Sequence, residues 1–218
     1  MTIETIKKAK AHQVYKTKDG QRVPGVTTIL GILDKPALKY WANKIGLLGI
    51  EVNKYVDELA DIGTLTHYRV ECEFAGRQAD LSDYSANQIN LSDNSMLSFY
   101  DWQKAHKIEP ISNELQLVSE EYGYGGTCDI YCLLDGKKTL IDLKTGKAIY
   151  DDHLLQVSAY RNLLIENGYE VEETRILNIP RAENEEFMER KLADPDAYFE
   201  IFIYCKKIYD LKKKIGMR

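Results

Sequence analysis

Several kinds of segment are missing from this sequence, and each absence removes a class of protein. No apolar run approaches the length of a membrane span, and the residues after Met1 lack the apolar core of a secretory signal. We therefore expect a location in the cell interior. No Gly-x-x-x-x-Gly-Lys-Ser/Thr motif occurs, so the sequence has no phosphate-binding loop of a nucleotide-driven motor. Internal repeats and low-complexity tracts are also absent.

Cysteine is scarce and scattered. The four residues Cys72, Cys128, Cys132 and Cys205 form no Cys-x-x-Cys pair, which argues against a zinc ribbon and against a secreted disulfide framework. An iron–sulfur cluster would need all four to converge, so none is expected. Cys128 and Cys132 are four residues apart in a strand pattern, and we expect both to pack in the core on one face.

The composition that remains is that of an ordinary globular protein, with an uneven distribution of charge. The 218 residues are 44% hydrophobic and 29% charged, enough for one domain with a sizeable core. The net charge is −5, yet residues 206–218 hold six basic residues and one acidic residue, and residues 1–24 hold six and two. The ends therefore suit contacts with phosphates, although a solvated surface explains them as well, and charge alone favours that simpler interpretation.

The most informative stretch is residues 125–146. Two apolar runs are separated there by Asp135-Gly136, a pair typical of a tight β-hairpin turn. Asp129 and Asp142 then lie on neighbouring antiparallel strands, and Lys144 shares a face of its strand with Asp142. Carboxylates that converge repel each other unless a cation lies between them. Oxygen ligands of this kind favour Mg²⁺ or Mn²⁺.

A helix expected from about Gly63 to Phe74 carries a second polar group. Thr64, His67 and Glu71 lie at positions i, i+3 and i+7, so they share one face of this helix. His67 and Glu71 could both reach a metal ion or a phosphate from there. An exposed polar face explains the same residues without any ligand.

Periodicity predicts the other elements. Residues 80–94 are the most polar stretch, and we expect a surface insertion or a poorly ordered loop there. Asp151 or Asp152 should cap the helix that is expected to run to about Glu166. The expected elements are a hairpin near 13–20, a helical region from 26, helices from 36, at 52–59, 63–74 and 96–106, strands at 111–120, 126–134 and 139–144, a helix at 151–166, strands at 173–180 and 185–192, and a helix from 194.

The last helix is expected to be amphipathic. An apolar stripe recurs at helical spacing and should pack inward, while the lysines point to solvent. The stripe consists of Ile201, Tyr204 or Cys205, Ile208, Leu211 and Ile215.

The ordered set of motifs resembles the PD-(D/E)XK nuclease superfamily. More narrowly it resembles the RecB-type branch, which includes phage exonucleases and the mitochondrial genome maintenance exonuclease. The resemblance spans residues 63–160, close to half of the chain, and its strength lies in the order of the motifs, because each motif alone is weak. The residues that carry it are His67, Glu114, Asp129, Asp142, Lys144, Gln156 and Tyr160.

The resemblance implies an α/β fold with a restriction-endonuclease-like αβββαβ core and a mixed sheet. Helical N-terminal additions and a C-terminal helix would complete a single nuclease domain over residues 1–218. Its parts would be a mainly helical region at 1–110, a sheet-containing catalytic core at 111–192 and the C-terminal helix at 193–218.

The resemblance also implies roles for these residues. The catalytic set would be Asp129, Asp142 and Lys144, with the lysine positioning or deprotonating the attacking water. One or two Mg²⁺ or Mn²⁺ ions would be held by Asp129, Asp142, the backbone carbonyl of Leu143 and His67. Five further residues would support the site by holding the metal ligands, the lysine or the nucleic-acid backbone. They are Glu114, Gln156, Tyr160, Thr64 and Glu71.

Three expectations accompany these roles. Glu120 and Glu121 lie close enough in sequence to compete with Glu114 for the place of the acidic residue on the first strand. A lysine beside a metal ion should have a depressed pKa, which would suit proton removal from water. Asp142→Asn or Lys144→Ala should lower the rate by about a hundredfold or more.

The function implied is a metal-dependent deoxyribonuclease, in particular an exonuclease acting on DNA ends in phage or bacterial recombination, repair or genome processing. The alternatives are a DNA-binding accessory subunit with a nuclease fold, a structure-specific endonuclease, and a hydrolase of another phosphate ester. The 15 tyrosines and the basic ends favour nucleic acid. Without a motor motif, the DNA end would be single-stranded or opened by a helicase or recombination partner, in the cytoplasm of a bacterium or phage-infected host. Polarity, DNA versus RNA, and oligomeric state stay open.

Overall fold

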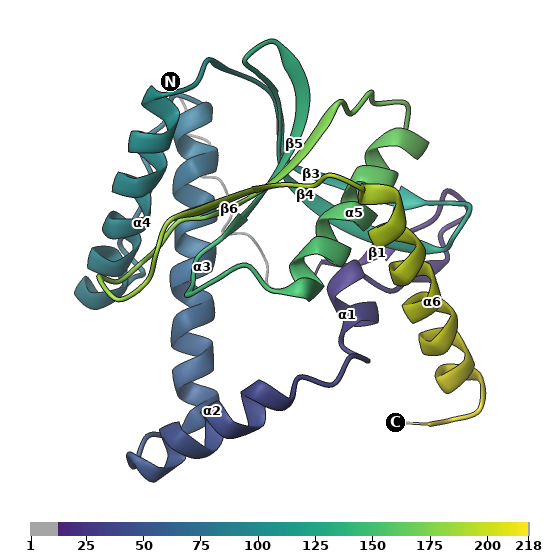
Figure 1. The fold of residues 1–218 in the computed structure, drawn as a ribbon, viewed down its shortest axis with the longest axis horizontal. Coiled ribbons are helices and arrows are strands. Elements are labelled where there is room, and N and C mark those ends of the chain that lie inside the picture. Colours follow the sequence, from purple (N-terminus) through teal and green to yellow (C-terminus); the bar gives the residue numbers. More distant parts are fainter. Residues whose placement is uncertain (1–12, 218) are drawn as a thin grey trace.

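A five-stranded sheet lies between two layers of helices in the computed structural model, which describes residues 13–217 (Figure 1). Neighbouring strands are antiparallel except β5 and β6, which are parallel and are connected by the helix α5 (Asp151–Glu166). The strands, in their order across the sheet, are β3 (Ile108–Ser119), β4 (Tyr124–Leu134), β5 (Lys137–Lys144), β6 (Glu173–Asn178) and β7 (Met188–Lys191).

The turn between β4 and β5 has the geometry that its sequence predicts. Asp135 and Gly136 both adopt positive φ angles, of 52° and 84°. Such angles at both central residues are those of a type I′ turn, whose twist matches the twist of the two strands. The hairpin pairs Leu134 with Lys137 next to the turn and Ile130 with Ile141 further along. This register determines which polar residues meet at the far end of the hairpin.

The helices divide between the two faces of the sheet. One face is covered by α1 (Val26–Leu30), α5 and α6 (Pro195–Lys214), which bury residues such as Leu140 and Phe202. The other face is covered by α3 (Val52–Phe74) and α4 (Ala86–Lys104), which bury Phe99, Ile141 and Leu143. Successive residues of β5 therefore enter opposite cores. Within residues 13–217, no helix combines the length and the apolar character that a membrane span requires.

Three elements lie outside these layers. The hairpin predicted near the start is confirmed as β1 (Tyr15–Lys16) and β2 (Arg22–Val23), and β1 packs beside β3 and β4. The helix α2 (Pro36–Leu47) begins at the proline that predicts it and buries none of its residues. In Figure 1, α2 crosses the far end of α3, well away from the sheet. The lysines of residues 1–12 and Arg218, which belong to the predicted basic ends, lie outside the described residues.

One prediction about the helices of the first half is wrong: residues 52–59 and 63–74 form a single helix, α3. Gly63 does not interrupt it, because Ile62 and Leu65 on either side are fully buried and anchor the helix. A Cβ at position 63 would lie only 3.2 Å from Thr145 Oγ1, so the glycine allows α3 to approach the segment that follows β5 closely.

The prediction of a loop at 80–94 is also wrong for most of that stretch. Helix α4 begins at Ala86, ten residues earlier than predicted, behind a capping box formed by Ser85 and Gln88. Two of its small polar residues are buried and hydrogen-bonded: Ser92 accepts a hydrogen bond from Thr66, and Ser95 donates to a carbonyl of the segment after β6. These two residues face the protein interior, while most of the other polar residues of the stretch face solvent, as on an amphipathic helix.

Most of the stripe predicted to pack inward on α6 faces outward instead, although Cys205, which the prediction offered as an alternative to Tyr204, is buried. Ile208 and Leu211 are 51% and 59% exposed, whereas Phe202 and Cys205 are buried. Phe202 contacts the ring of Tyr124 in an edge-on arrangement, with centroids 4.9 Å apart. The face of α6 that carries Phe202 therefore packs in the core. Its aromatic rings fill more of the space beside α5 than the aliphatic stripe would. The N-cap of α5 also differs, since Tyr150 occupies it in place of Asp151 or Asp152.

Candidate active site

Carboxylates from three adjacent strands stand in one row across the sheet. The register of β3 with β4 continues on both sides of Glu114 and places it opposite Asp129. One step beyond the pair Ile130–Ile141, Asp129 lies opposite Asp142 on β5. Neither Glu114 nor Asp129 takes part in regular pairing, so the strands are free to present both side chains to the same region. The predicted convergence of acidic groups at the end of the hairpin is thus seen in the structure.

The backbone at Glu114 is unusual for a strand. Its φ angle of 49° lies in the left-handed region, which non-glycine residues rarely adopt. Such angles cost free energy and are found most often where function requires them. The prediction that Cys128 and Cys132 share one face of their strand is wrong. Both are buried, but they pack in the cores on opposite faces of the sheet. Strand alternation is therefore interrupted between them.

His67 completes a cluster with two of the carboxylates. Its Nδ1 lies 3.6 Å from Glu114 Oε1 and 3.5 Å from Asp129 Oδ1. The imidazole, on α3, is 24% exposed, so it can be approached from solvent. Burial alone would lower the pKa of His67, but Asp129 and Glu114 outweigh burial and raise the pKa to about 10. A cationic imidazolium thus balances two carboxylates in the protein's own charge arrangement.

Asp142 and Lys144 form the second half of the site. Asp142 is fully buried, and its Oδ2 lies 2.6 Å from Lys144 Nζ. Burial raises the pKa of Asp142 to about 6, against the opposing effect of Lys144. The depressed pKa expected of a lysine beside a bound metal ion stays a prediction for the ion-bound site. Burial acts in that direction, but Asp142 and Asp129 outweigh it, so the pKa of Lys144 is raised.

Asp129 links the two halves. Its Oδ2 accepts a hydrogen bond of 2.7 Å from the backbone N–H of Leu143, which lies between Asp142 and Lys144. Burial would raise the pKa of Asp129, but His67, Lys144 and this hydrogen bond lower it. The carboxylate therefore stays ionised, and it holds the Asp142–Leu143 peptide, which directly precedes the predicted carbonyl ligand of Leu143.

The donor set fits a divalent cation. One ligand atom each from His67, Glu114 and Asp129 can be chosen so that all lie within 4.8 Å of one another. Both carboxylate oxygens of Asp142 are buried without a partner in hydrogen-bonding geometry among the described residues, although Oδ2 is within ion-pair distance of Lys144. Buried oxygens left in this way are costly unless something binds them. Carboxylate and imidazole ligands together suit Mg²⁺ or Mn²⁺, with imidazole favouring manganese.

Gln156 and Tyr160 lie beneath the row on α5. Gln156 Nε2 donates a hydrogen bond of 2.9 Å to the hydroxyl of Tyr160, and the tyrosine is 6% exposed. Burial and the nearby Asp142 and Asp129 raise the pKa of Tyr160, so its hydroxyl stays protonated. A Cβ at Gly126 would lie 2.5 Å from this ring, so the glycine is what allows Tyr160 to approach β4.

Sequence reasoning missed Tyr15, which supports the row from the other side. Its hydroxyl is hydrogen-bonded to Thr127 Oγ1 at 2.9 Å, and Gly125 leaves space for its ring, which a Cβ there would meet at 2.3 Å. Burial raises the pKa of Tyr15, as do Glu114 and Asp129 nearby. The two consecutive glycines in the motif signal close approach on both sides of β4, but not which residues approach.

His153 on α5 was also missed. Burial and the positive charge of Lys144 lower its pKa to about 4, so the imidazole is neutral at physiological pH. Its Nδ1 accepts a hydrogen bond of 3.2 Å from the backbone N–H of Tyr150 at the start of α5. The neighbouring Asp152 forms an ion pair with Lys35 at 2.6 Å, which ties α5 to the segment before α2. In sequence, nothing distinguishes His153 from a surface histidine.

The remaining predicted residues differ in their distance from the row. Glu71, one helical turn beyond His67, is close enough to Glu114 that burial and this carboxylate raise its pKa. Thr64 lies on α3 three residues before His67 and is half-buried. Glu120 does not compete with Glu114, because it accepts a hydrogen bond from the backbone of Lys18 at the far end of β3.

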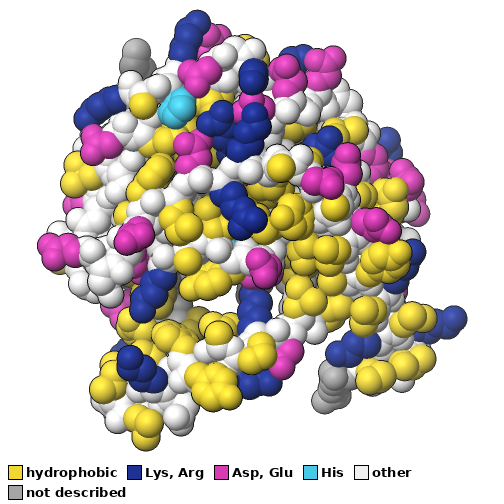
Figure 2. All heavy atoms as spheres, in the orientation of Figure 1, with side chains coloured by type: hydrophobic (Ala, Val, Ile, Leu, Met, Phe, Trp, Pro, Cys, Tyr) yellow, Lys and Arg dark blue, Asp and Glu magenta, His cyan; other side chains and the backbone are white. Residues whose placement is uncertain are grey.

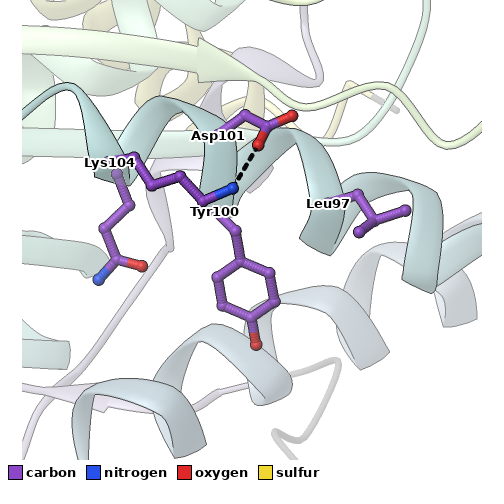
Figure 3. A pocket seen from close by; sticks show the side chains of 5 residues that line it. Leu97, Tyr100, Asp101 and Lys104 are labelled. Carbon is purple, nitrogen blue, oxygen red and sulfur yellow. Dashed lines mark hydrogen bonds and ion pairs between the residues drawn. The ribbon is translucent and has the colours of Figure 1, made fainter.

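A shallow hollow elsewhere on the surface is unrelated to this cluster (Figure 3). It is lined by five residues of α4, including Leu97, Tyr100 and the ion pair Asp101–Lys104. Both charged side chains are 76% exposed, and such a pair contributes little to stability. None of the predicted site residues borders the hollow.

Comparison with solved structures identifies the fold. A candidate exonuclease from Eubacterium rectale superimposes with a TM-score of 0.50 and 12% sequence identity, over 74% of this chain and 69% of that one. The chain has a restriction-endonuclease-like fold. An alkaline exonuclease from Laribacter hongkongensis gives a TM-score of 0.33 at 12% identity, over 69% of this chain and 83% of that one. This TM-score is too low to support an inference. No protein-family model and no curated protein matches the sequence.

Proposed function

We propose that this chain is a deoxyribonuclease that depends on Mg²⁺ or Mn²⁺ and hydrolyses phosphodiester bonds. The observation that carries the proposal is the row of Glu114, Asp129 and Asp142, with His67 and Lys144 at its two sides. Three carboxylates in one place would destabilise a purely structural core, because each ionised carboxylate raises the free energy of the others. The fold shared with a candidate exonuclease supports the same conclusion.

The proposed ligands are His67, Asp129, Asp142 and the carbonyl of Leu143, with Glu114 as a further carboxylate in reach. A divalent ion at these ligands would lower the pKa of a bound water and neutralise charge on the phosphate. The protein's own contribution is preorganisation: Asp129 holds the Leu143 peptide in place, and the strands fix the spacing of the carboxylates. The ligands therefore need little change of position, although the His67 imidazolium would release its proton when a cation binds.

Lys144 is proposed to stabilise the transition state by its charge. Its pKa is raised, so the ammonium stays protonated at neutral pH and can donate to a phosphate oxygen or orient the attacking water. Gln156 and Tyr160 are proposed to support this region from below, and Glu71 and Thr64 from α3. This assignment favours positioning by the lysine over proton removal by it.

The narrower proposal is an exonuclease of the RecB-type or phage branch that acts on DNA ends. We propose that the whole of residues 1–218 forms this nuclease domain, and that the DNA end is single-stranded or is opened by a recombination or helicase partner. Lys35, whose side chain is 43% exposed beside Asp152 at the start of α5, suits a contact with phosphates.

The test is degradation of end-labelled DNA, single- and double-stranded, linear and circular, with Mg²⁺, Mn²⁺ or EDTA. Wild type is compared with Lys144→Ala and with Lys138→Ala, a control on the same strand whose lysine pairs with Glu170 on the surface. We expect metal-dependent loss of linear DNA alone, reduced about a hundredfold or more by Lys144→Ala and unchanged by Lys138→Ala.

Two results would contradict the proposal in different ways. Cutting of circular DNA would replace the exonuclease with an endonuclease. Binding of DNA without cleavage by either metal would replace the enzyme with a DNA-binding accessory subunit.

A further inference from the structure

An apolar seam runs along α6 on the side turned away from the sheet. Its members recur at alternating intervals of three and four residues, which is the heptad spacing of paired helices. Figure 2 shows hydrophobic side chains gathered on the side of the molecule where Figure 1 places α6, with Lys and Arg side chains at the lower end. The seam consists of Ile201, Tyr204, Ile208, Leu211 and Ile215, each between 48% and 67% exposed.

This seam is additional to the face that α6 uses within the chain. Phe202 and Cys205 fill the core beside α5, so the helix already has the apolar contact that holds it to the sheet. Single exposed aliphatic residues are common on protein surfaces and need no explanation. A continuous seam of five at heptad spacing is different, because it matches the surface that a second helix would cover.

We propose that α6 pairs with α6 of a second copy of this chain, in antiparallel orientation. The charges at the two ends of the helix determine the orientation. Asp196 and Glu200 lie in the N-terminal half, and the last turn contains lysines 212–214. A parallel pair would place Lys207 beside Lys212 of the other copy and give Glu200 no basic partner. The antiparallel pair brings the two Lys207 residues together at the axis but gains two pairs of Glu200 with lysines. An antiparallel pair places Glu200 beside lysines 212–214 of the other copy, at both ends.

The seam also specifies a register. Tyr204 packs against Ile208 of the second copy and Ile201 against Leu211, around a two-fold axis that crosses the middle of α6. The helix macrodipoles then oppose each other, which is favourable. The seam covers only about two heptads, so the dimer is expected to be concentration-dependent and not permanent.

The test is sedimentation equilibrium of the full chain over a wide range of concentrations. We expect a monomer–dimer equilibrium, weakened about tenfold or more by Ile208→Gln, because this residue leaves water when the helices pair. Leu47→Gln places the same side chain at a position of α2 that is 80% exposed and outside the seam, and it should leave the equilibrium unchanged. Far-ultraviolet circular dichroism verifies that both variants fold. A chain that stays monomeric at its highest soluble concentration overturns the proposal.

A charge exchange tests the orientation. Glu200→Lys should weaken the antiparallel dimer, and combining it with Lys212→Glu and Lys214→Glu in the same chain should restore it, because the pairs are re-formed with signs reversed. In a parallel pair Glu200 faces Cys205, and Glu200→Lys would have no such effect. Dimerisation that is insensitive to Glu200→Lys therefore overturns the antiparallel arrangement.

Discussion

At the scale of single residues, burial of the Asp142 carboxylate, which the proposed metal site requires, opposes folding. Its buried carboxyl has a pKa of about 6, above the value of 3.8 that applies in an unfolded chain. The folded state therefore holds the proton more tightly, and stability falls as the pH rises from about 4 to 6.

Replacing this carboxyl with a neutral amide should therefore stabilise the protein. We expect Asp142→Asn to unfold at a higher urea concentration than wild type at pH 7.5 in EDTA, with the difference vanishing near pH 4. Asp101→Asn, at an exposed carboxylate of α4, is the matched control and should change little at either pH. Equal stability of Asp142→Asn and wild type at pH 7.5 would mean that Asp142 is not strained by burial.

The glycine pair of β4 supports a second prediction at this scale. A Cβ at Gly126 would lie 2.5 Å from the ring of Tyr160, and the ring has no free space to move into because it is buried. We expect Gly126→Ala to lower the free energy of unfolding by about 1–3 kcal/mol through overpacking. Gly46→Ala, in α2 with nothing within 4 Å, should instead stabilise the protein slightly. Thermal unfolding of the two variants would check both signs.

At the scale of elements, the start of α4 depends on its capping box. The Ser85 hydroxyl accepts a hydrogen bond from the backbone N–H of Gln88, whose side chain accepts from the backbone of Ser85. Ser85→Ala should cost about 1 kcal/mol of stability and speed amide exchange in the first turn. Ser82→Ala, three residues earlier and outside the helix, serves as control. An unchanged first turn in Ser85→Ala would show that packing alone fixes the start of the helix.

The same capping box shows how far elements could be predicted from sequence. The strands and the hairpin turn were predictable because Asp135-Gly136 and the alternating runs are local signals. The continuity of α3 through Gly63 and the early start of α4 were not, because they depend on contacts with residues such as Thr145 and Ile179 that are distant in sequence. The outward face of α6 was mistaken for the inward one because both faces are apolar.

The residues that converge at the candidate site could be predicted from the sequence, but the pKa values of its charged groups could not. His67, Glu114, Asp129 and Asp142 converge as their order in the sequence suggests. The raised pKa of Lys144 could not be foreseen, since it depends on how burial compares with the field of two carboxylates. Tyr15 and His153 carry no sequence signal of their own, and only the fold brings them to the site. The roles of all these residues remain predictions.

At the scale of the whole molecule, cation binding should be visible as stability. A ligand that binds only the folded state adds about 2.7 kcal/mol when its concentration is a hundred times its dissociation constant. We therefore expect Mn²⁺ to raise the melting temperature of wild type by several degrees, and to have little effect on Asp129→Asn. Glu120→Gln, an exposed acid outside the row, should respond like wild type. A response retained in full by Asp129→Asn would place the cation elsewhere.

The helix α2 contributes no buried residue, and this has a consequence for how the chain is digested. Its contact with α3 includes the stacked rings of Trp41 and Tyr55, with centroids 6.0 Å apart, and little burial resists its opening. Within residues 13–217, trypsin should therefore cut after Lys39 or Lys44 in α2 long before it attacks the sheet. The fluorescence of Trp41 should report that early event, while Trp102, a buried residue of α4, should report the unfolding of the core. The two tryptophans thus divide the unfolding of this protein into a peripheral and a central step.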